Sequence, residues 1–564
     1  MKLPKLELLI TAKGIASLFQ PDGFMNTKTI QNTLKISMIV LVGLFFLPLT
    51  SKGEEKMLPP ETTIEKAIDY YIEASWKEKK LKPAVAADDT VWLRRVSLDL
   101  AGRIPTASEA KAFAEDKDPA KKQKTIERLI ASPLHLRHQA QEIETFLMNG
   151  TKGALAEYLT KAITENRSWD RIFKEIILAD ESDASNKGSS DFLKTRVKDL
   201  DRLTNDVSVA FFGVNVSCAQ CHDHPLVADW KQDHFYGMKA FFSRTYEVGT
   251  FLAEKEYGVV KFLPNKGKEK QADFMFLTGK TVKPAGMTEP TKEELKKEKE
   301  MVEEWKKNKT QPPKPKNSTR AMLLDLALNK GDQDFFAKAF VNQVWNRFYG
   351  FGLVMPLDQM HSENPPSHPE LMNWLARDFA NNGFNIPRLI KGMVSSKVYG
   401  LSSRYEGEST PLAKDFAMAR LKPLTPMQMG VSLRLAGQFL TGNEQEKKVD
   451  EISRGSRGLA DQFAQPTEDF QIGVTEALFF SNSSRFQTEC LGEGKDKLVT
   501  AMTSLATQEE QADLAVWSVL SRGATSDEKA VIAGYLKKHG ANAQDASKQV
   551  LWSLMASPEF RFNH

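Results

Sequence analysis

Apolar residues recur at three- and four-residue intervals over most of the chain, which is the spacing of one face of a helix. The stretches TTIEKAIDYYIEASWKEKKL at 62–81 and KKQKTIERLIASPLHLRHQAQEIETFLM at 121–148 both follow this pattern. Between them, Thr106 and Glu109 have the spacing of a capping box, in which two side chains bond the free backbone groups at a helix start. Residues 58–245 are therefore predicted to form a helical domain.

The pattern changes after residue 245. Residues 246–287 contain short runs rich in β-branched and aromatic residues, broken by Gly and Pro, which predict a small β insert. Residues 288–318 are a charge run that ends in PPKPKNS. Such a composition is typical of a solvated helix followed by a linker, so we interpret it as a domain boundary.

Helical spacing returns in residues 319–564, which are predicted to form a second helical domain. Three pairs in it have the capping-box spacing: Ser367 with Glu370, Thr425 with Gln428, and Thr525 with Glu528. The predicted fold class is therefore mainly α, with two helical domains and a small β-containing insert between them.

The N-terminal region has the layout of a secretory signal peptide. Lys28 and Lys35 precede an apolar run at 36–50, and small residues follow it before Glu54. The run of about 15 residues is shorter than the roughly 20 that a helix needs to cross a bilayer. We therefore expect residues 1–53 to be an N-terminal extension and signal peptide, and the mature protein to be periplasmic or extracellular with no stable membrane span.

Composition narrows the class of partner. The 564 residues include 77 Lys+Arg and 73 Asp+Glu, a formal net charge of +4. This balance gives no field that would attract nucleic acid, so no nucleic-acid partner is expected.

The segment VSCAQCH at 216–222 contains the strongest chemical signal of the chain. Covalent haem attachment requires two thiols that add to the porphyrin vinyl groups and an adjacent imidazole that binds iron, and CxxCH supplies all three. Cys218, Cys221 and His222 are therefore predicted to hold one haem c, with His222 as an iron ligand. Export agrees with this reading, because haem c is attached outside the cytoplasm.

The second axial ligand of the iron is not decided by the sequence. His224 is too close to His222 to reach the opposite face of a porphyrin, and it stays only in the wider set of candidate metal ligands. The other members of that set are His234, Met238, His361 and His368. Without such a ligand the iron would be open to small molecules, which is the pattern of an enzyme, so the sequence leaves enzymatic activity undecided.

Two other readings of the segment remain open. Cys218, Cys221, His224 and His234 offer four ligands for a tetrahedral zinc ion, although their spacing is irregular. A disulfide between Cys218 and Cys221 is the simplest alternative. The third cysteine, Cys490, is expected to be a partly buried small hydrophobe.

Two groups of residues near these motifs have both a structural and a functional reading. We favour a structural ion-pair role over contact with a cofactor carboxylate for the charged residues of WLRRVSLDL, which are Arg94, Arg95 and Asp99. The aromatic residues near CxxCH either wall an apolar cofactor pocket or form ordinary helical core; they are Phe211, Phe212, Trp230, Phe235, Tyr236, Phe241 and Phe242.

Several long motifs of the chain resemble one known family. They are WLRRVSLDLAGRIPTASEAKAF and GVNVSCAQCHDHPLVADWKQDHFYGMKAFF in the first half, and FAKAFVNQVWNRFYGFGLVMP, NPPSHPELMNWLARDFANNGF and ASPEFRFNH in the second. The chain is similar, over most of residues 60–564, to exported planctomycete-type proteins in which a cytochrome-associated domain precedes a second domain of unknown function. The resemblance implies export and a cytochrome-linked context, and it implies no settled activity.

These observations lead to one functional hypothesis and one alternative. The hypothesis is an exported c-type haem protein in electron transfer or haem-based redox chemistry, with an unknown redox partner and a second domain that binds a protein or polymer. The alternative is a non-enzymatic binding or scaffold protein whose CxxCH region holds zinc or a disulfide.

Overall fold

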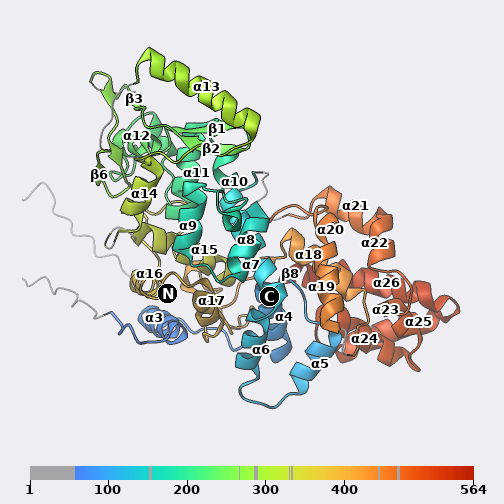
Figure 1. The fold of residues 1–564 in the computed structure, drawn as a ribbon. Coiled ribbons are helices and arrows are strands. Elements are labelled where there is room, and N and C mark those ends of the chain that lie inside the picture. The colour runs from blue at the N-terminus through green and yellow to red at the C-terminus, as the bar shows by residue number, and fades with distance from the viewer. Residues whose placement is uncertain are drawn as a thin grey trace, which may run out of the picture. The chain divides into compact units, whose positions relative to one another are not determined.

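The computed structural model describes residues 57–564 except 152–154, 266, 285–289, 330, 332–333, 443–444 and 467–470. The predicted signal peptide and extension, 1–53, lie outside the described residues. Helices dominate the ribbon in Figure 1, and the strands of the described chain pair only in two-stranded sheets. The predicted mainly α fold class is confirmed.

The first half is a succession of helices joined by short loops. They are α3 (Ile64–Lys79), α4 (Asp89–Ala101), α5 (Ala107–Glu115), α6 (Lys121–Ile130), α7 (Pro133–Met148), α8 (Leu155–Thr164), α9 (Trp169–Leu178), α10 (Asp191–Lys194), α11 (Leu200–Phe212) and α12 (Gln232–Ala240). Short 3₁₀ helices lie at Ala184–Asn186 and Ser217–Gln220.

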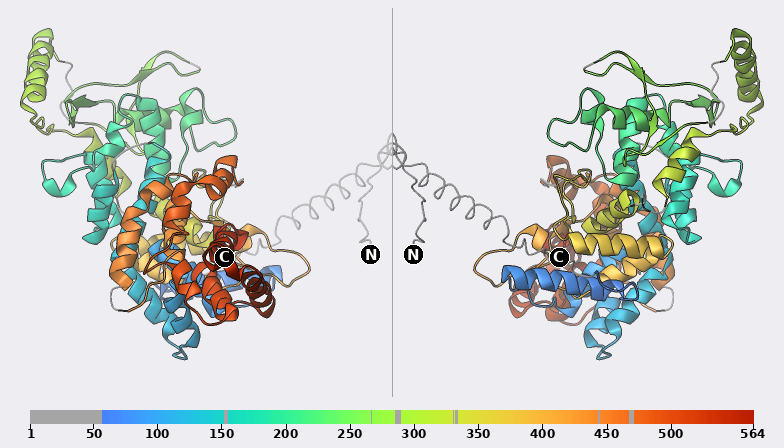
Figure 2. Two further views of the ribbon diagram at one scale, coloured as in Figure 1. Left: turned by 90° about the vertical axis from the view of Figure 1, so that its right-hand side faces the viewer. Right: turned by 90° about the vertical axis from the view of Figure 1, so that its left-hand side faces the viewer.

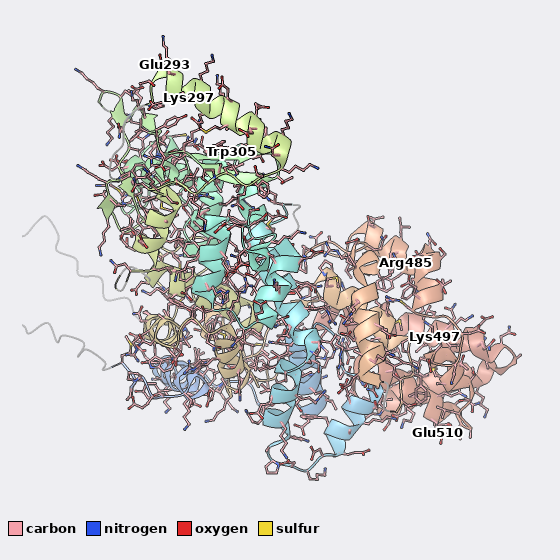
Figure 3. All side chains as sticks on the ribbon, in the orientation of Figure 1. Glu293, Lys297, Trp305, Arg485, Lys497 and Glu510 are labelled. Carbon is pink, nitrogen blue, oxygen red and sulfur yellow. The ribbon has the colours of Figure 1, made fainter. Side chains whose placement is uncertain are left out.

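Three antiparallel hairpins follow, in the stretch where the sequence predicts short strands. They are β1 (Thr245–Val248) with β2 (Phe251–Glu254), β3 (Lys261–Phe262) with β4 (Lys270–Gln271), and β5 (Phe274–Met275) with β6 (Thr281–Val282). Helix α13 (Lys292–Asn308) comes next and has no buried residue, as the charge run predicts. It lies at the edge of the described chain in all views of Figures 1 and 2, and Figure 3 shows the side chains of Glu293 and Lys297 projecting from it.

The second half is again helical. Its helices are α14 (Thr319–Ala327), α15 (Asp334–Tyr349), α16 (Pro369–Asn381), α17 (Ile386–Val394), α18 (Pro426–Ala436), α19 (Gln445–Gly455), α20 (Arg457–Ala460), α21 (Val474–Asn482), α22 (Ser484–Glu489), α23 (Leu498–Thr503), α24 (Gln508–Leu520), α25 (Ser526–Lys538), α26 (Ala543–Met555) and α27 (Pro558–Arg561). The 3₁₀ helices Ala413–Asp415 and Gly540–Asn542 and the short hairpin of β7 (Lys422–Pro423) with β8 (Phe562–Asn563) complete it.

The capping boxes test the local predictions. Those at Thr106, Thr425 and Thr525 are confirmed, since each side chain bonds the backbone three residues on and receives the reciprocal bond. The box predicted at Ser367 is wrong. Helix α16 begins one residue later, with His368 at the N-cap and a proline at its first position, and a proline with its fixed φ favours that start.

Contacts cross repeatedly between the two halves within Leu58–His564, which form one compact unit. Helix α3 packs against α16 and α17, α4 contacts β8, and α11 packs along α15. One continuous cluster of buried apolar side chains runs from the first half into the second. Within the described ranges no helix has the length and apolar character needed to cross a membrane.

Candidate functional site

The CxxCH segment follows the end of α11. That helix stops at Gly213, whose φ of 66° is the left-handed conformation that glycine adopts readily. The 3₁₀ helix Ser217–Gln220 then carries Cys218, so the motif begins in a tight turn rather than in an α-helix. Cys218, Cys221 and His222 are all exposed, and both thiols are free.

The backbone under the motif is held by the two flanking helices. The Asn205 side chain of α11 accepts a hydrogen bond from Val216 N (3.0 Å). The carbonyl oxygen of Gln220 accepts from Tyr236 Oη of α12 (3.1 Å) and from Gln232 Nε2 (3.3 Å). The reactive groups therefore lie on the surface of a turn whose main chain has several fixed partners.

The two histidines that follow the motif, His224 and His234, accept hydrogen bonds from nearby backbone N–H groups. His224 Nδ1 accepts from Val227 N (3.0 Å) and Leu226 N (3.3 Å), which stabilises the loop after the motif. His234 Nδ1 accepts from Lys231 N (3.2 Å) at the start of α12, and burial lowers the pKa of His234. Among the residues that the structure describes, no three His, Cys, Asp or Glu side chains form a group that could hold a metal ion.

The three more distant candidate ligands lie in different surroundings. Met238 is fully buried in the apolar core. His368 is buried at the start of α16 with its ring against Phe416, and burial lowers its pKa to about 4. His361 lies in the loop between α15 and α16, where its Nδ1 is buried without a hydrogen-bond partner.

That loop of the second half docks directly on the CxxCH region. Asn215 N donates to the Asp358 carbonyl oxygen (2.8 Å), and Met360 N donates to the Gly213 carbonyl oxygen (3.0 Å). Further on, Ser362 N and Oγ both donate to the Asp229 carboxylate, each at 2.8 Å. Of the two candidates in the second half, His361 rather than His368 thus lies in the segment that contacts the CxxCH loop.

The aromatic residues near the motif form core rather than an open pocket. All seven aromatic residues for which the sequence left both readings open are buried, except Tyr236, which is partly buried. Phe211 packs on Phe173 with ring centroids 4.6 Å apart, and Tyr236 stacks on Phe262 at 4.1 Å. Cys490 is fully buried, where the sequence predicts partial burial, and this burial raises the pKa of its thiol to about 12.

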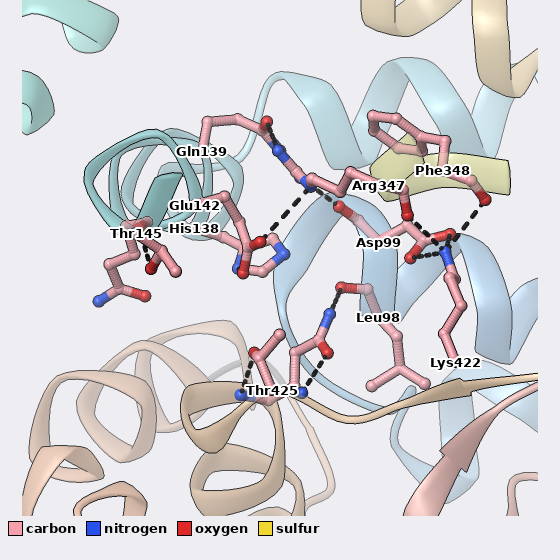
Figure 4. Close-up of polar contacts among 12 residues, drawn as sticks. Leu98, Asp99, His138, Gln139, Glu142, Thr145, Arg347, Phe348, Lys422 and Thr425 are labelled. Carbon is pink, nitrogen blue, oxygen red and sulfur yellow. Dashed lines mark hydrogen bonds and ion pairs between the residues drawn. The ribbon is translucent and has the colours of Figure 1, made fainter. Parts of the chain in front are cut away.

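A second polar site is buried between the two halves, and Figure 4 shows its centre at Asp99 of α4. The Asp99 carboxylate accepts from Lys422 Nζ (2.8 and 2.9 Å), Tyr399 Oη (2.8 Å) and Asn563 Nδ2 (2.8 Å). Arg347 of α15 donates through Nη2 to the Asp99 carbonyl oxygen (2.9 Å). The carboxylate of this one residue in the first half thus accepts hydrogen bonds from three separate segments of the second half.

The groups around this centre are strongly perturbed by burial. Desolvation raises the pKa of Glu142, lowers the pKa of Lys422 and holds the pKa of His138 well below its usual range. A lysine with a lowered pKa can act as a nucleophile or base. Lys422, however, also donates to the carbonyl oxygens of Arg347 (2.9 Å) and Phe348 (3.1 Å), so its ammonium group is fully engaged in holding the fold.

The two arginines beside Asp99 serve the same junction. Arg94 donates to the carbonyl oxygen of Phe560 (3.0 Å), and Arg95 to those of Tyr399 (2.6 Å) and Leu401 (2.8 Å). Their described bonds go to backbone oxygens and, from Arg94, also to the Ser521 hydroxyl (3.3 Å), rather than to Asp99, whose ionic partner is Lys422. These contacts agree with the structural role expected for Arg94, Arg95 and Asp99. The ion pair, however, joins Asp99 to Lys422 rather than to either arginine.

Two family models match the chain. PSCyt2, a protein of unknown function (DUF1549), matches residues 67–247, and PSD1, a protein of unknown function (DUF1553), matches residues 320–453. The chain belongs to this two-domain family. No curated protein and no solved structure matches it.

In these terms, the CxxCH segment and Asp99 belong to the PSCyt2 region, while Arg347 and Lys422 belong to the PSD1 region. Sequence reasoning missed Arg347, Lys422, Glu142 and His138 as members of the buried site. A signal for Arg347 exists, because it is the lone charged residue in the largely aromatic and apolar run VWNRFYGF at 344–351. Nothing in the residues around Lys422 indicates burial.

Proposed function

We propose that the chain is an exported c-type haem protein that acts in electron transfer or haem-based redox chemistry. The observation that carries the proposal is the joint exposure of Cys218, Cys221 and His222 on one held turn, with both thiols free. Covalent attachment requires that these three groups reach one macrocycle, and exposed groups meet that need without opening the apolar core. When bound, haem supplies one-electron redox chemistry.

The chain's own residues contribute a fixed support for the group. Tyr236 and Gln232 of α12 hold the carbonyl oxygen of Gln220, and Asn205 of α11 holds the start of the turn. A surface position also suits exchange of electrons with a protein partner. We assign to the PSD1 region the binding of that partner or of a polymer, since one haem needs only about one small domain to hold it.

The test is expression of the chain with its signal peptide in a host that has a cytochrome c maturation system. The proposal expects reduced haem bands in the visible spectrum and an intact mass that is larger by one haem. Both should be lost in the Cys218→Ala/Cys221→Ala double variant. Cys490→Ala is the matched control, because that thiol is buried, and it should keep both signals.

The same preparation separates the alternatives. A colourless protein of unmodified mass would overturn the haem proposal. Stoichiometric zinc that is lost in the double variant would then favour a metal-holding scaffold. A mass two hydrogens lower, restored by reductant, would favour a disulfide between Cys218 and Cys221.

A further inference from the structure

The exposed turn that carries CxxCH is followed by an apolar surface. Leu226 is 83% exposed, and Pro225 and Ala228 beside it are exposed as well. Leu226 comes four residues after His222, in a loop whose shape is fixed because the backbone N–H of Leu226 donates to His224 Nδ1 (3.3 Å). A leucine that is largely exposed gains free energy when a partner covers it.

The loop between the CxxCH thiols and α12 is also acidic. It carries Asp223 and Asp229 against one cation, Lys231. Asp223 is exposed and Asp229 is partly buried. Both carboxylates are held in place, since Asp223 accepts from Gln232 N (3.0 Å) and Asp229 accepts from Ser362 N (2.8 Å) of the second half.

The segment of the second half that docks on this loop adds charge of the same sign. Residues 356–364 include Asp358 and Glu363 and no lysine or arginine. Glu363 is exposed, and the partly buried Asp358 carboxylate accepts from Asn215 Nδ2 (2.9 Å). The two segments that contact each other therefore carry four carboxylates and one ammonium group.

The electrostatics of one histidine show that these carboxylates are grouped. Burial lowers the pKa of His234 at the start of α12, while the charges of Asp233, Asp229 and Asp223 act in the opposite direction. Asp233 pairs with Lys270 (2.6 Å), which largely neutralises it and leaves Asp229 and Asp223 as the source of the negative field. The acidic side chains thus lie close together beside the CxxCH turn.

The negative charge is local to this face. The formal net charge of the whole chain is +4, so a basic protein feels no general attraction to it. An apolar centre with a charged rim is the form of interface in which rim charges steer the encounter and the apolar contact holds it. Weak redox encounters use small interfaces of this kind.

Resting on the haem function proposed above, we propose that this face docks a small redox protein with a basic surface around its own cofactor. Lysines of the partner pair with the rim carboxylates, and an apolar edge of the partner covers Leu226. This arrangement places the partner's cofactor next to the CxxCH turn, where electron exchange with the haem is expected.

The probe that tests the docking is a small basic cytochrome c, and its control is the same protein with acetylated lysines. Calorimetric titration measures their binding to the full mature chain at about 10 mM and about 150 mM ionic strength, where the Debye length is about 30 Å and about 8 Å. We expect micromolar binding of the basic probe at low salt, at least tenfold weaker binding at high salt, and no binding of the acetylated probe. Equal binding of the two probes, or no binding of either, would overturn the proposal.

Charge variants locate the contact. Asp223→Asn/Glu363→Gln removes two rim charges, keeps the acceptor for Gln232 N, and should weaken binding about tenfold at low salt. The matched control, Glu115→Gln/Glu451→Gln, removes two exposed carboxylates on α5 and α19, away from α12 in Figure 1, and should leave binding unchanged. Equal weakening in both double variants would contradict the assignment.

A second pair of variants tests the apolar centre. Leu226→Ser should weaken binding several-fold at both salt concentrations, because salt does not screen an apolar contact. Leu412→Ser makes the same change at another exposed position (63%) and should have no effect. A parent chain that sediments as a dimer and becomes monomeric in Leu226→Ser would assign the face to a second copy and overturn the proposal.

The Cys218→Ala/Cys221→Ala chain separates this test from the haem test. Docking needs only the surface, so this variant should bind the basic probe as tightly as the parent chain. Only the parent chain should accept one electron from the reduced probe. Binding without electron transfer in the parent chain would support the docking and count against the haem function, whereas attached haem without binding would do the reverse.

Discussion

Replacing Lys422 by Met should measure how much the buried junction between the two family regions stabilises the chain. The Lys422 side chain is 17% exposed and its partner Asp99 4%, so the substitution leaves a buried carboxylate without its cation. Breaking a buried ion pair by removing one member typically destabilises by about 3–5 kcal/mol. Asp99 keeps the donors of Tyr399 and Asn563, which stabilise its charge in part. We therefore expect a loss at the lower end, about 3 kcal/mol.

Urea denaturation of the purified chain measures this change in the free energy of unfolding, provided that the slope of free energy against urea is unchanged. Lys397→Met is the matched control, because Lys397 is 79% exposed and lies 3.4 Å from Glu73, where pairs contribute about 0–1 kcal/mol. The double variant Asp99→Asn/Lys422→Met removes both charges, so no unpaired charge stays buried. Its loss of stability should therefore be about 1–2 kcal/mol smaller than the summed losses of Asp99→Asn and Lys422→Met. A Lys422→Met chain within about 0.5 kcal/mol of Lys397→Met would refute the reasoning.

Two further predictions rest on burial. The pKa values of His135 and His368 are lowered by burial to about 4, against about 6.5 when unfolded, so the stability they contribute is present above pH 6.5 and is lost as the pH falls toward 4. Each histidine should account for a loss of about 1.4 kcal/mol in the free energy of unfolding at pH 5.5. The urea midpoint of His368→Asn should therefore shift less between pH 7.5 and 5.5 than that of the parent chain. An equal shift would contradict this prediction. In the reduced chain without haem, a thiol reagent should modify Cys218 and Cys221 in the native state and Cys490 only after denaturation, and rapid native modification of all three would disprove the burial of Cys490.

Features that depend on neighbouring residues could be read from the sequence. Three of the four predicted capping boxes are confirmed, because both partners of such a box lie within one turn of each other. The solvated helix α13 followed from its charges alone. The box at Ser367 failed since the pattern does not say which of two adjacent residues starts the helix, and the proline after His368 decides it.

Features that depend on distant partners could not be predicted. The tail 310–318 reads as a linker, yet Gln311 bonds Asp180, which is 131 positions away, and the segment forms a cavity wall. In the same way, Asp99 and Lys422 are separated by 323 positions. Periodicity indicates which face of a helix is buried, but it does not indicate which distant segment covers that face.

The buried junction also makes a prediction about the two family regions as folding units. Arg94, Arg95 and Asp99 are each less than 4% exposed, and their described acceptors and cation lie at residues 399–564. A fragment of residues 58–245 alone would leave these three charged groups of α4 without those partners, together with the face of α11 that packs on α15. We therefore expect this fragment to lack cooperative unfolding and to bind a hydrophobic dye, and to recover a cooperative transition when it is co-expressed with residues 246–564. Thermal denaturation followed by near-ultraviolet circular dichroism decides the point. A sharp transition in the isolated fragment would mean that PSCyt2 folds independently and that the Asp99 junction only joins two preformed domains.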